Sequence, residues 1–386
     1  MTENKTNTIQ SPLELKGFPK FMSFLCHRSL ERAIWTFCEL GIPDLMASYK
    51  APITAVELGQ LNGNNWNAEF LYRLLRAVTN ADVIKQLEIN NENLNENNHP
   101  EQSIQFQLTD DGLLLTSNHP SKTRDMILLE LSPQTDNICS YYPALIKYGC
   151  NKGDGFQQTF GCSLYDYMQK EENKDYANIF NNAMVGFSSY EISFILPVID
   201  FSHFNTLVDI GGGFGSLLSS VLGKFQNLHG ILFDLPQVIE NAKIIKPNEF
   251  EKKLIEQKRY DFVAGDVFKS DTIPSADAYM LKYIIHGWND EKAIEILKSL
   301  RNANKKQAGK TITVFIAETV ILSNSKEYWE VHVFDLELLA FIGSKERALS
   351  EYIYLLNESG YRFKQLHRTQ SPLSIIEAIT TIEDGN

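Results

Sequence analysis

The sequence lacks long apolar runs, although 43% of its 386 residues are hydrophobic. The longest, such as the run around Ile192 to Val198, is far shorter than the roughly 20 residues that a helix needs to cross a bilayer. The segment Met1 to Ser11 is polar and lacks the basic-then-apolar order of a secretory signal. We therefore expect a cytoplasmic protein with no membrane span and with enough residues for two domains.

Cysteine and positive charge are also scarce. Five cysteines are an odd number and form no C-x-x-C pair, which disfavours a disulfide framework or a zinc site, so we expect no metal. There are 36 Lys and Arg residues against 48 Asp and Glu residues, giving a net charge of -12 with no visible basic cluster. Such a chain repels a phosphate backbone, and we expect no nucleic-acid partner.

The N-terminal third is predicted to be mainly helical. Apolar residues recur every three or four positions from Gly17 to Met46, which is typical of amphipathic helices. The segments that follow predict a winged helix, with a wing loop at Asn90 to Pro100. Its predicted helices and strands are Ala55 to Leu61, Asn67 to Thr79, Val83 to Ile89 and Ile104 to Leu108.

A winged helix leaves open a ligand-binding regulator that reads DNA. Such a regulator needs basic residues on the second helix of the motif, and that helix offers only Arg73 and Arg76. The composition therefore favours another use of this domain.

From Thr206 onward, strand-like and helix-like segments alternate. This pattern predicts a doubly wound α/β domain, with a parallel sheet covered by helices on both faces and a hairpin at its end. The domains expected are 12–118 (winged helix), 119–200 (connecting helices, including Asp175 to Val198) and 201–386 (α/β domain). The strands expected are Thr206 to Ile210, Gly230 to Asp234, Asp261 to Ala264, Ala278 to Leu281, Thr311 to Ala317, Tyr361 to Leu366 and Leu373 to Ala378.

A glycine-rich turn follows the first of these strands. The sequence from Asp209 to Gly215 reads DxGGGxG, and glycines here let a ligand approach the backbone closely. A dinucleotide fingerprint needs a third glycine where Ser216 stands, so the spacing disfavours NAD. The turn fits a nucleoside cofactor without phosphates, or else a tight structural turn.

Polar residues end the next three strands. Asp234 either accepts hydrogen bonds from two ribose hydroxyls or caps the helix that begins at Leu235-Pro236. Asp266 either accepts an adenine amino group, with Val267 and Phe268 packed on the ring, or belongs to a turn. Lys282 lies near the cofactor or in solvent.

His286 follows the fourth strand, at the sheet edge where ligands bind. A histidine with a pKa near 6.5 suits proton removal from a hydroxyl, although a lone histidine is more often structural. Glu318, expected at the end of the fifth strand, and Glu346 would orient the imidazole if their loops converge. Otherwise both are solvated acids, Glu346 within the charged run from Lys345 to Arg347.

These segments form an ordered series of short motifs: DxGGGxG, FDLPxV, GDxF, LKxxxHxW, AE, GxKER and SPLSIIEA. The series closely resembles class I O-methyltransferases of the caffeate and hydroxyindole type, particularly the bacterial secondary-metabolite branch, over nearly the whole chain. The resemblance implies S-adenosylmethionine as cofactor, a small aromatic hydroxyl compound as substrate, and a homodimer formed through the winged-helix domain. It implies His286 as general base, flanked by Glu318 and Glu346.

The resemblance also implies a binding site. Around the cofactor it places Gly211, Asp234, Asp266, Val267 and Lys282, and our prediction adds Gly213, Leu235 and Phe268. On the helix around Phe180 to Met184 it turns Met184, Phe187 and Ser188 toward substrate or cofactor, and we assign Ser188 to the cofactor. Phe160 and Trp288 are further candidates for an aromatic-lined substrate pocket, although core packing explains such residues equally well.

The sequence departs from this family at one position and also allows two alternative functions. Gly287 stands where most plant relatives have aspartate, which would loosen the loop that carries His286. The same scaffold with S-adenosylmethionine as a spectator in a pericyclic or decarboxylating step is the main alternative function. A metal-dependent methyltransferase is a further alternative, but Asn289 and Asp290 alone make no convincing site.

Overall fold

The structure, a computed structural model, describes residues 14–87, 99–244, 249–305, 311–322 and 329–381. It divides into two compact units, one of Met1–Asp136 with Asp175–Gly186 and one of Asn137–Lys174 with Phe187–Asn386. Helix α12 (Lys174–Ile195) runs through both. None of the helices in the described ranges is long and apolar enough to cross a membrane.

The first unit contains the expected winged helix. Strands β1, β3 and β2 form an antiparallel sheet, and the hydroxyl of Thr54 and the amide oxygen of Asn67 cap α3 and α4. Phe37, Leu75 and Phe106 lie in its core. The expected wing loop lies outside the described residues except for 99 and 100. The elements are α1 (Phe18–Glu39), α2 (Ile42–Tyr49), β1 (Ile53–Thr54), α3 (Ala55–Gln60), α4 (Ala68–Val78), β2 (Ile84–Gln86), α5 (Pro100–Ser103), β3 (Gln105–Leu108), α6 (Asp110–Leu113) and α7 (Thr123–Glu130).

Short helices precede the large sheet: α8 (Pro133–Cys139), α9 (Tyr142–Tyr148), α10 (Gly155–Phe160) and α11 (Leu164–Met168). The sequence did not resolve these four, because each is only one or two turns long. In α10, Asp154 and Gln157 form a reciprocal capping box, a local signal that marks its start.

The second unit is built on a sheet with strand order β10-β11-β8-β7-β4-β5-β6, in which β4 to β8 pair in parallel and β11 and β10 antiparallel. This confirms the doubly wound α/β fold with a terminal hairpin. The strands are β4 (Thr206–Ile210), β5 (His229–Asp234), β6 (Tyr260–Ala264), β7 (Ala278–Lys282), β8 (Thr313–Ile321), β9 (Arg347–Ala348), β10 (Tyr361–Arg368) and β11 (Leu373–Thr380). The helices are α13 (Ser216–Lys224), α14 (Pro236–Ile244), α15 (Glu249–Glu256), α16 (Asp290–Ala303), α17 (Trp329–Ile342) and α18 (Leu349–Glu358).

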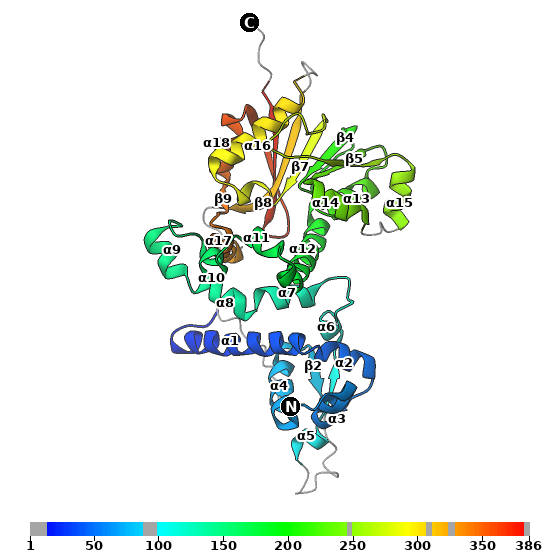
Figure 1. The fold of residues 1–386 in the computed structure, drawn as a ribbon, viewed down its shortest axis with the longest axis vertical. Helices are drawn as coiled ribbons and strands as arrows, with labels where there is room; N and C mark the ends of the chain where they lie inside the picture. Colours follow the sequence, from blue (N-terminus) through cyan, green and yellow to red (C-terminus); the bar gives the residue numbers. More distant parts are fainter. Residues whose placement is uncertain (1–13, 88–98, 245–248, 306–310, 323–328, 382–386) are drawn as a thin grey trace, which may run out of the picture. The chain divides into compact units, whose positions relative to one another are not determined.

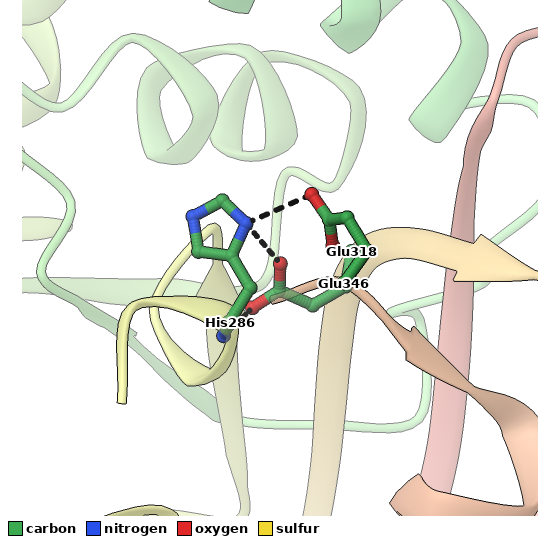
Figure 2. A group of neighbouring side chains, drawn as sticks. All are labelled: His286, Glu318 and Glu346. Atoms are coloured by element: carbon green, nitrogen blue, oxygen red, sulfur yellow. Dashed lines mark hydrogen bonds and ion pairs between the residues drawn. The ribbon is translucent and has the colours of Figure 1, made fainter. Parts of the chain in front are cut away.

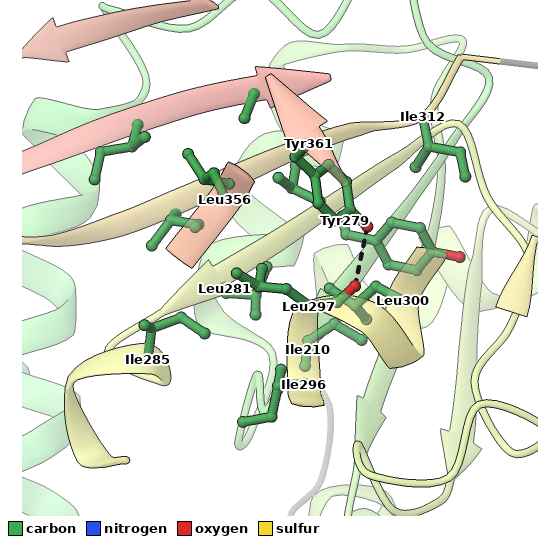
Figure 3. Packing of buried hydrophobic residues seen from close by; sticks show 14 of the residues in the cluster. Ile210, Tyr279, Leu281, Ile285, Ile296, Leu297, Leu300, Ile312, Leu356 and Tyr361 are labelled. Atoms are coloured by element: carbon green, nitrogen blue, oxygen red, sulfur yellow. Dashed lines mark hydrogen bonds between the residues drawn. The ribbon is translucent and has the colours of Figure 1, made fainter. Parts of the chain in front are cut away.

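Alternate residues of each central strand enter opposite cores. On β7, Tyr279 and Leu281 pack with α16 and α18, whereas Met280 packs with α12 to α15 on the other face. Figure 1 shows α16 and α18 beside the sheet, and Figure 3 shows the first core, where the Tyr361 hydroxyl donates to the carbonyl of Leu297 at 3.2 Å. Because both faces are covered, ligands reach the sheet at the carboxyl ends of its strands.

Candidate functional site

His286 lies on a single 3-10 turn, Ile285–Gly287, directly after β7. Its Nδ1 atom lies 3.1 Å from Oε1 of Glu346 and 3.4 Å from Oε2 of Glu318. Figure 2 shows both carboxylates on the Nδ1 side of the ring, whereas Nε2 points away from them. The Nδ1–H tautomer therefore donates to Glu346 and leaves the Nε2 lone pair for a proton from another molecule.

Glu318 is fully buried, and the carboxylate oxygen that does not face the ring binds the backbone. Its Oε1 accepts hydrogen bonds from the amide of Ile285 at 2.8 Å and of His286 at 3.2 Å. Expecting Glu318 at a strand end was wrong, because β8 continues to Ile321 through pairing with β9 and β11. This carboxylate therefore fixes the turn that carries His286 as well as facing its ring.

Glu346 and Arg347 are both buried, so the alternative interpretation of Glu346 as a solvated surface acid is wrong. The amide of Glu346 donates to Asp335 on α17 at 2.7 Å, which orients the residue toward His286. The Arg347 guanidinium donates to the carbonyls of Ile285 and Trp288 and to the carboxylate of Asp290.

The segment that carries Glu346 and Arg347 also contacts the loop around Gly287. The hydroxyl of Ser344 donates to the carbonyl of His286, and a side chain at position 287 would meet nothing within 4 Å. Hydrogen bonds to the carbonyls of His286 and Trp288 thus hold the loop on both sides of Gly287.

Burial and neighbouring charges have opposite effects on the pKa of His286. Burial lowers the pKa of His286, but the carboxylates of Glu318 and Glu346 outweigh it and raise that pKa above its usual value. Burial also raises the pKa of Glu318. One oxygen of each glutamate, Oε2, has no hydrogen-bond partner in the described structure. One ligand atom from each of the three residues lies within 4.8 Å of the others, a spacing that a cation could also use.

The glycine turn between β4 and α13 forms a second polar site at the same sheet edge. Gly211 and Gly213 have φ values of 63° and 59°, which residues other than glycine adopt only with backbone strain. The amide of Gly213 donates to Asp234 at 3.0 Å, and the amide of Leu235 donates to the same carboxylate at 2.7 Å. Asp234 thus links the glycine turn to the segment that leads into α14, although neither donor belongs to that helix, which begins at Pro236.

Asp209, at the base of this turn, is almost completely buried. Its Oδ2 has no hydrogen-bond partner among the described residues, and burial raises its pKa to about 7. An acid left this way beneath an open backbone turn fits a ligand that brings its own donors.

Lys282 is not solvated. Its Nζ atom lies 3.2 Å from Glu191 and donates to the hydroxyl of Ser188 at 3.0 Å, both on α12. The Tyr283 hydroxyl also donates to Glu191. These contacts place Ser188 beside Lys282 within the second unit.

The predicted adenine-binding residues form a turn after β6. Asp266 accepts a hydrogen bond from the amide of Phe268 at 3.0 Å, and this bond holds the pKa of Asp266 below its usual value. The ring of Phe268 packs edge-on against Trp288 at 5.0 Å, while Val267 is half-buried. Trp288 therefore touches a residue assigned to the cofactor, in addition to any contact with substrate.

The other substrate candidates lie on α10 and α12. Phe160 packs with Phe156 and Tyr167, and Phe341 of α17 joins this cluster through Phe156. Phe187 is half-buried in the second unit, whereas Met184 is exposed in the first.

Comparison with known proteins decides the family. Residues 142–362 match the profile of the O-methyltransferase domain. The chain is 31% identical to cephaeline 6'-O-methyltransferase of Carapichea ipecacuanha over 350 residues, 89% of each chain. It is 30% identical to phenazine O-methyltransferase PhzM of Lysobacter antibioticus, covering 90% of this chain and 92% of that one. The solved structure of mitomycin 7-O-methyltransferase MmcR matches with a TM-score of 0.75 at 26% identity, covering 94% and 97%.

The chain belongs to the O-methyltransferase family. It is an S-adenosylmethionine-dependent O-methyltransferase, and the resemblance found in the sequence is confirmed. The glycine turn, the carboxylate of Asp234 and the unpartnered oxygen of Asp209 fit the amino acid and ribose parts of this cofactor, both of which carry hydrogen-bond donors.

Several residues of this O-methyltransferase escaped the sequence analysis. Asp335, Ser344 and Arg347 hold the loop of His286 or its partner Glu346; the last two lie within the GxKER motif, but nothing in that motif indicated these bonds. Glu191 and Tyr283 had no local signal. Their side chains meet only after α12 packs beside β7.

Proposed function

We propose that this O-methyltransferase methylates a hydroxyl of a small aromatic secondary metabolite, with His286 as the general base. One observation carries the proposal: Nδ1 of His286 is occupied by Glu346, so Nε2 is the free, basic nitrogen of a fixed ring. Glu318 supports the same role because it binds the backbone of the turn and adds negative charge beside the ring.

The mechanism follows from these residues. When bound, S-adenosylmethionine supplies an electrophilic methyl group on a positively charged sulfur. Nε2 of His286 accepts the proton of the substrate hydroxyl, which frees the oxygen to attack. The imidazolium that forms is stabilised by Glu346 and Glu318, and the proton then passes to solvent.

The cofactor is proposed to lie along the turn of Gly211 and Gly213. In this proposal its ribose hydroxyls bond to Asp234 beside Leu235, and its adenine lies between Asp266, Val267 and Phe268. Lys282 and Ser188, which bond to each other, border the methionine part. The substrate is proposed to lie near Trp288, Phe187 and Phe160, while Met184 remains a prediction from the sequence.

An aromatic acceptor is supported by the side chains available and by the relatives. Flat rings such as Trp288 and Phe160 bind flat substrates well. Phenazine O-methyltransferase and mitomycin 7-O-methyltransferase are named for polycyclic acceptors. The non-methylating alternative receives no support from these relatives, which are all named as methyltransferases.

We propose in addition that two copies associate through residues 12–118. On α1, Phe18, Phe21, Met22 and Leu25 are all exposed, at the i, i+3, i+4, i+7 spacing of one helix face. Residues 119–200 would then supply substrate-binding helices and 201–386 the cofactor domain.

The experiment is calorimetric titration with S-adenosylmethionine and S-adenosylhomocysteine, followed by a screen of phenols and hydroxyquinones for methylated product by mass spectrometry. We expect micromolar binding and at least one methyl ether. The screen is repeated with EDTA, which leaves the rate unchanged if no metal takes part. Cofactor binding without any product over a broad panel would favour the spectator alternative. No binding of the cofactor would contradict the proposal.

A further inference from the structure

Tyr283 has an unusual backbone for its size. Its φ is 56°, in the left-handed region that bulky residues rarely adopt, and its amide donates to the carbonyl of Ala317 at 3.1 Å. It is the only aromatic residue with a positive φ in the described ranges. Such backbone strain persists only where surrounding contacts require it, so the position of this side chain deserves an explanation.

The ring of Tyr283 covers one face of His286. The two ring centroids lie 5.2 Å apart, and the ring planes differ by only 18°. Glu346 fixes the imidazole from its edge through Nδ1, and Tyr283 contacts its face. An edge contact alone leaves the ring free to tilt, whereas the two contacts together restrict its orientation.

The far end of the phenol is anchored. Its hydroxyl donates to Glu191, whose other oxygen lies 3.2 Å from Nζ of Lys282. The side chains of Glu191 and Lys282 are only 12% and 13% exposed, so water competes little for these bonds. Glu191 and the left-handed backbone thus hold the ring from both ends.

An aromatic face also bears on the charge of the imidazole. A cation over an aromatic face is stabilised by about 0.5–2 kcal/mol, which corresponds to roughly 0.4–1.5 pKa units. The charged groups that act on His286 are Glu318 of β8, Glu346, which precedes β9, and Lys282 of β7. The first two favour the imidazolium and the third opposes it.

We propose that Tyr283 is a positioning residue for His286: anchored by Glu191, its ring keeps the imidazole oriented and favours its protonated form. The inference rests on the proposed function for its catalytic meaning. The contact with the histidine, however, is measurable without any substrate.

The test is NMR of protein labelled in its histidines, with His286→Asn to assign the signal. The variants are Tyr283→Gly, which suits the left-handed backbone but removes the ring, and Tyr283→Phe, which keeps the ring. Tyr283→Leu repeats the ring deletion with more of the volume retained. Tyr279→Phe is the control, since it removes the hydroxyl of a buried tyrosine on β7, the strand that precedes Tyr283, and this hydroxyl bonds to the carbonyl of Pro274.

We expect Tyr283→Gly and Tyr283→Leu to lower the pKa of His286 by roughly 0.4–1.5 units and to mix its tautomers. Tyr283→Phe, which keeps the ring but loses its bond to Glu191, should change both less than the ring deletions do, and the control should keep both near wild type. A wild-type pKa and tautomer in the ring-deleted variants overturns the proposal, as does an equal change in Tyr283→Phe. Either result stands whether or not the protein proves to methylate a phenol, so the two proposals fail separately.

Discussion

At the scale of the residue, the two glutamates beside His286 have separate tasks. Glu346 accepts a hydrogen bond from the ring nitrogen, whereas one oxygen of Glu318 accepts hydrogen bonds from the backbone amides of the turn. Their negative charges raise the pKa of His286 despite burial. As the proposed base, His286 must be neutral to accept a proton, so we predict that the rate of methyl transfer rises with pH through this raised pKa.

Replacing Glu346 by Gln removes that charge while keeping an acceptor for Nδ1–H. The pKa of His286 should fall, so the acid limb of the pH–rate profile should move to lower pH. The plateau rate should drop about tenfold or more because the base is weaker. Glu358→Gln, which changes an exposed acid of α18, is the matched control. An unmoved acid limb in Glu346→Gln would argue against its contact with the base.

Arg347 is the residue whose loss should cost most stability near the site. Arg347→Met leaves two carbonyls and the carboxylate of Asp290 without their donor, at a cost of about 2–4 kcal/mol. The measurement is urea unfolding, with the exposed neighbour Lys345→Met as control. A loss equal to that of the control would mean that the guanidinium does not hold the loop.

At the scale of the element, the turn between β4 and α13 connects a strand to a helix and is our proposed cofactor site. A Cβ at Gly213 meets nothing within 4 Å, although the φ of 59° disfavours it. We predict that Gly213→Ala folds but binds S-adenosylmethionine about tenfold or more weakly, because the methyl group occupies the cofactor's place. Gly63→Ala is the control, since it combines a φ of 79° with equally open space. If calorimetry finds the same affinity for S-adenosylmethionine in both variants, the cofactor does not bind along this turn.

How much the sequence could predict depends on how local each signal is. The parallel strands were recognisable because buried strands are continuous apolar runs ending at polar residues, as in β5 and β7. The two-residue β9 was missed because only its pairing with β8 creates it. The sequence left Glu346 open between a partner of His286 and a surface acid, and gave no role to Arg347, for a similar reason: their partners, His286 and Asp290, lie about 60 residues away.

At the scale of the whole molecule, the exposed face of α1 predicts assembly. Phe21→Asp combined with Leu25→Asp should convert a dimer into a monomer, because two charges would be buried without partners at the interface. Phe70→Asp, on an exposed position of α4, should leave the dimer intact. Light scattering coupled to size-exclusion chromatography measures both. A wild-type protein that is monomeric at micromolar concentration would contradict the proposed dimer.

The most direct test of the account separates binding from chemistry at His286. Cofactor affinity and methyl-transfer rate are measured for wild type and His286→Ala, using an acceptor found in the screen. The account predicts nearly unchanged affinity for S-adenosylmethionine and a rate lower by about 10²- to 10⁴-fold. A rate close to wild type, or an equal loss of affinity and rate, would contradict the assignment of His286 as the base.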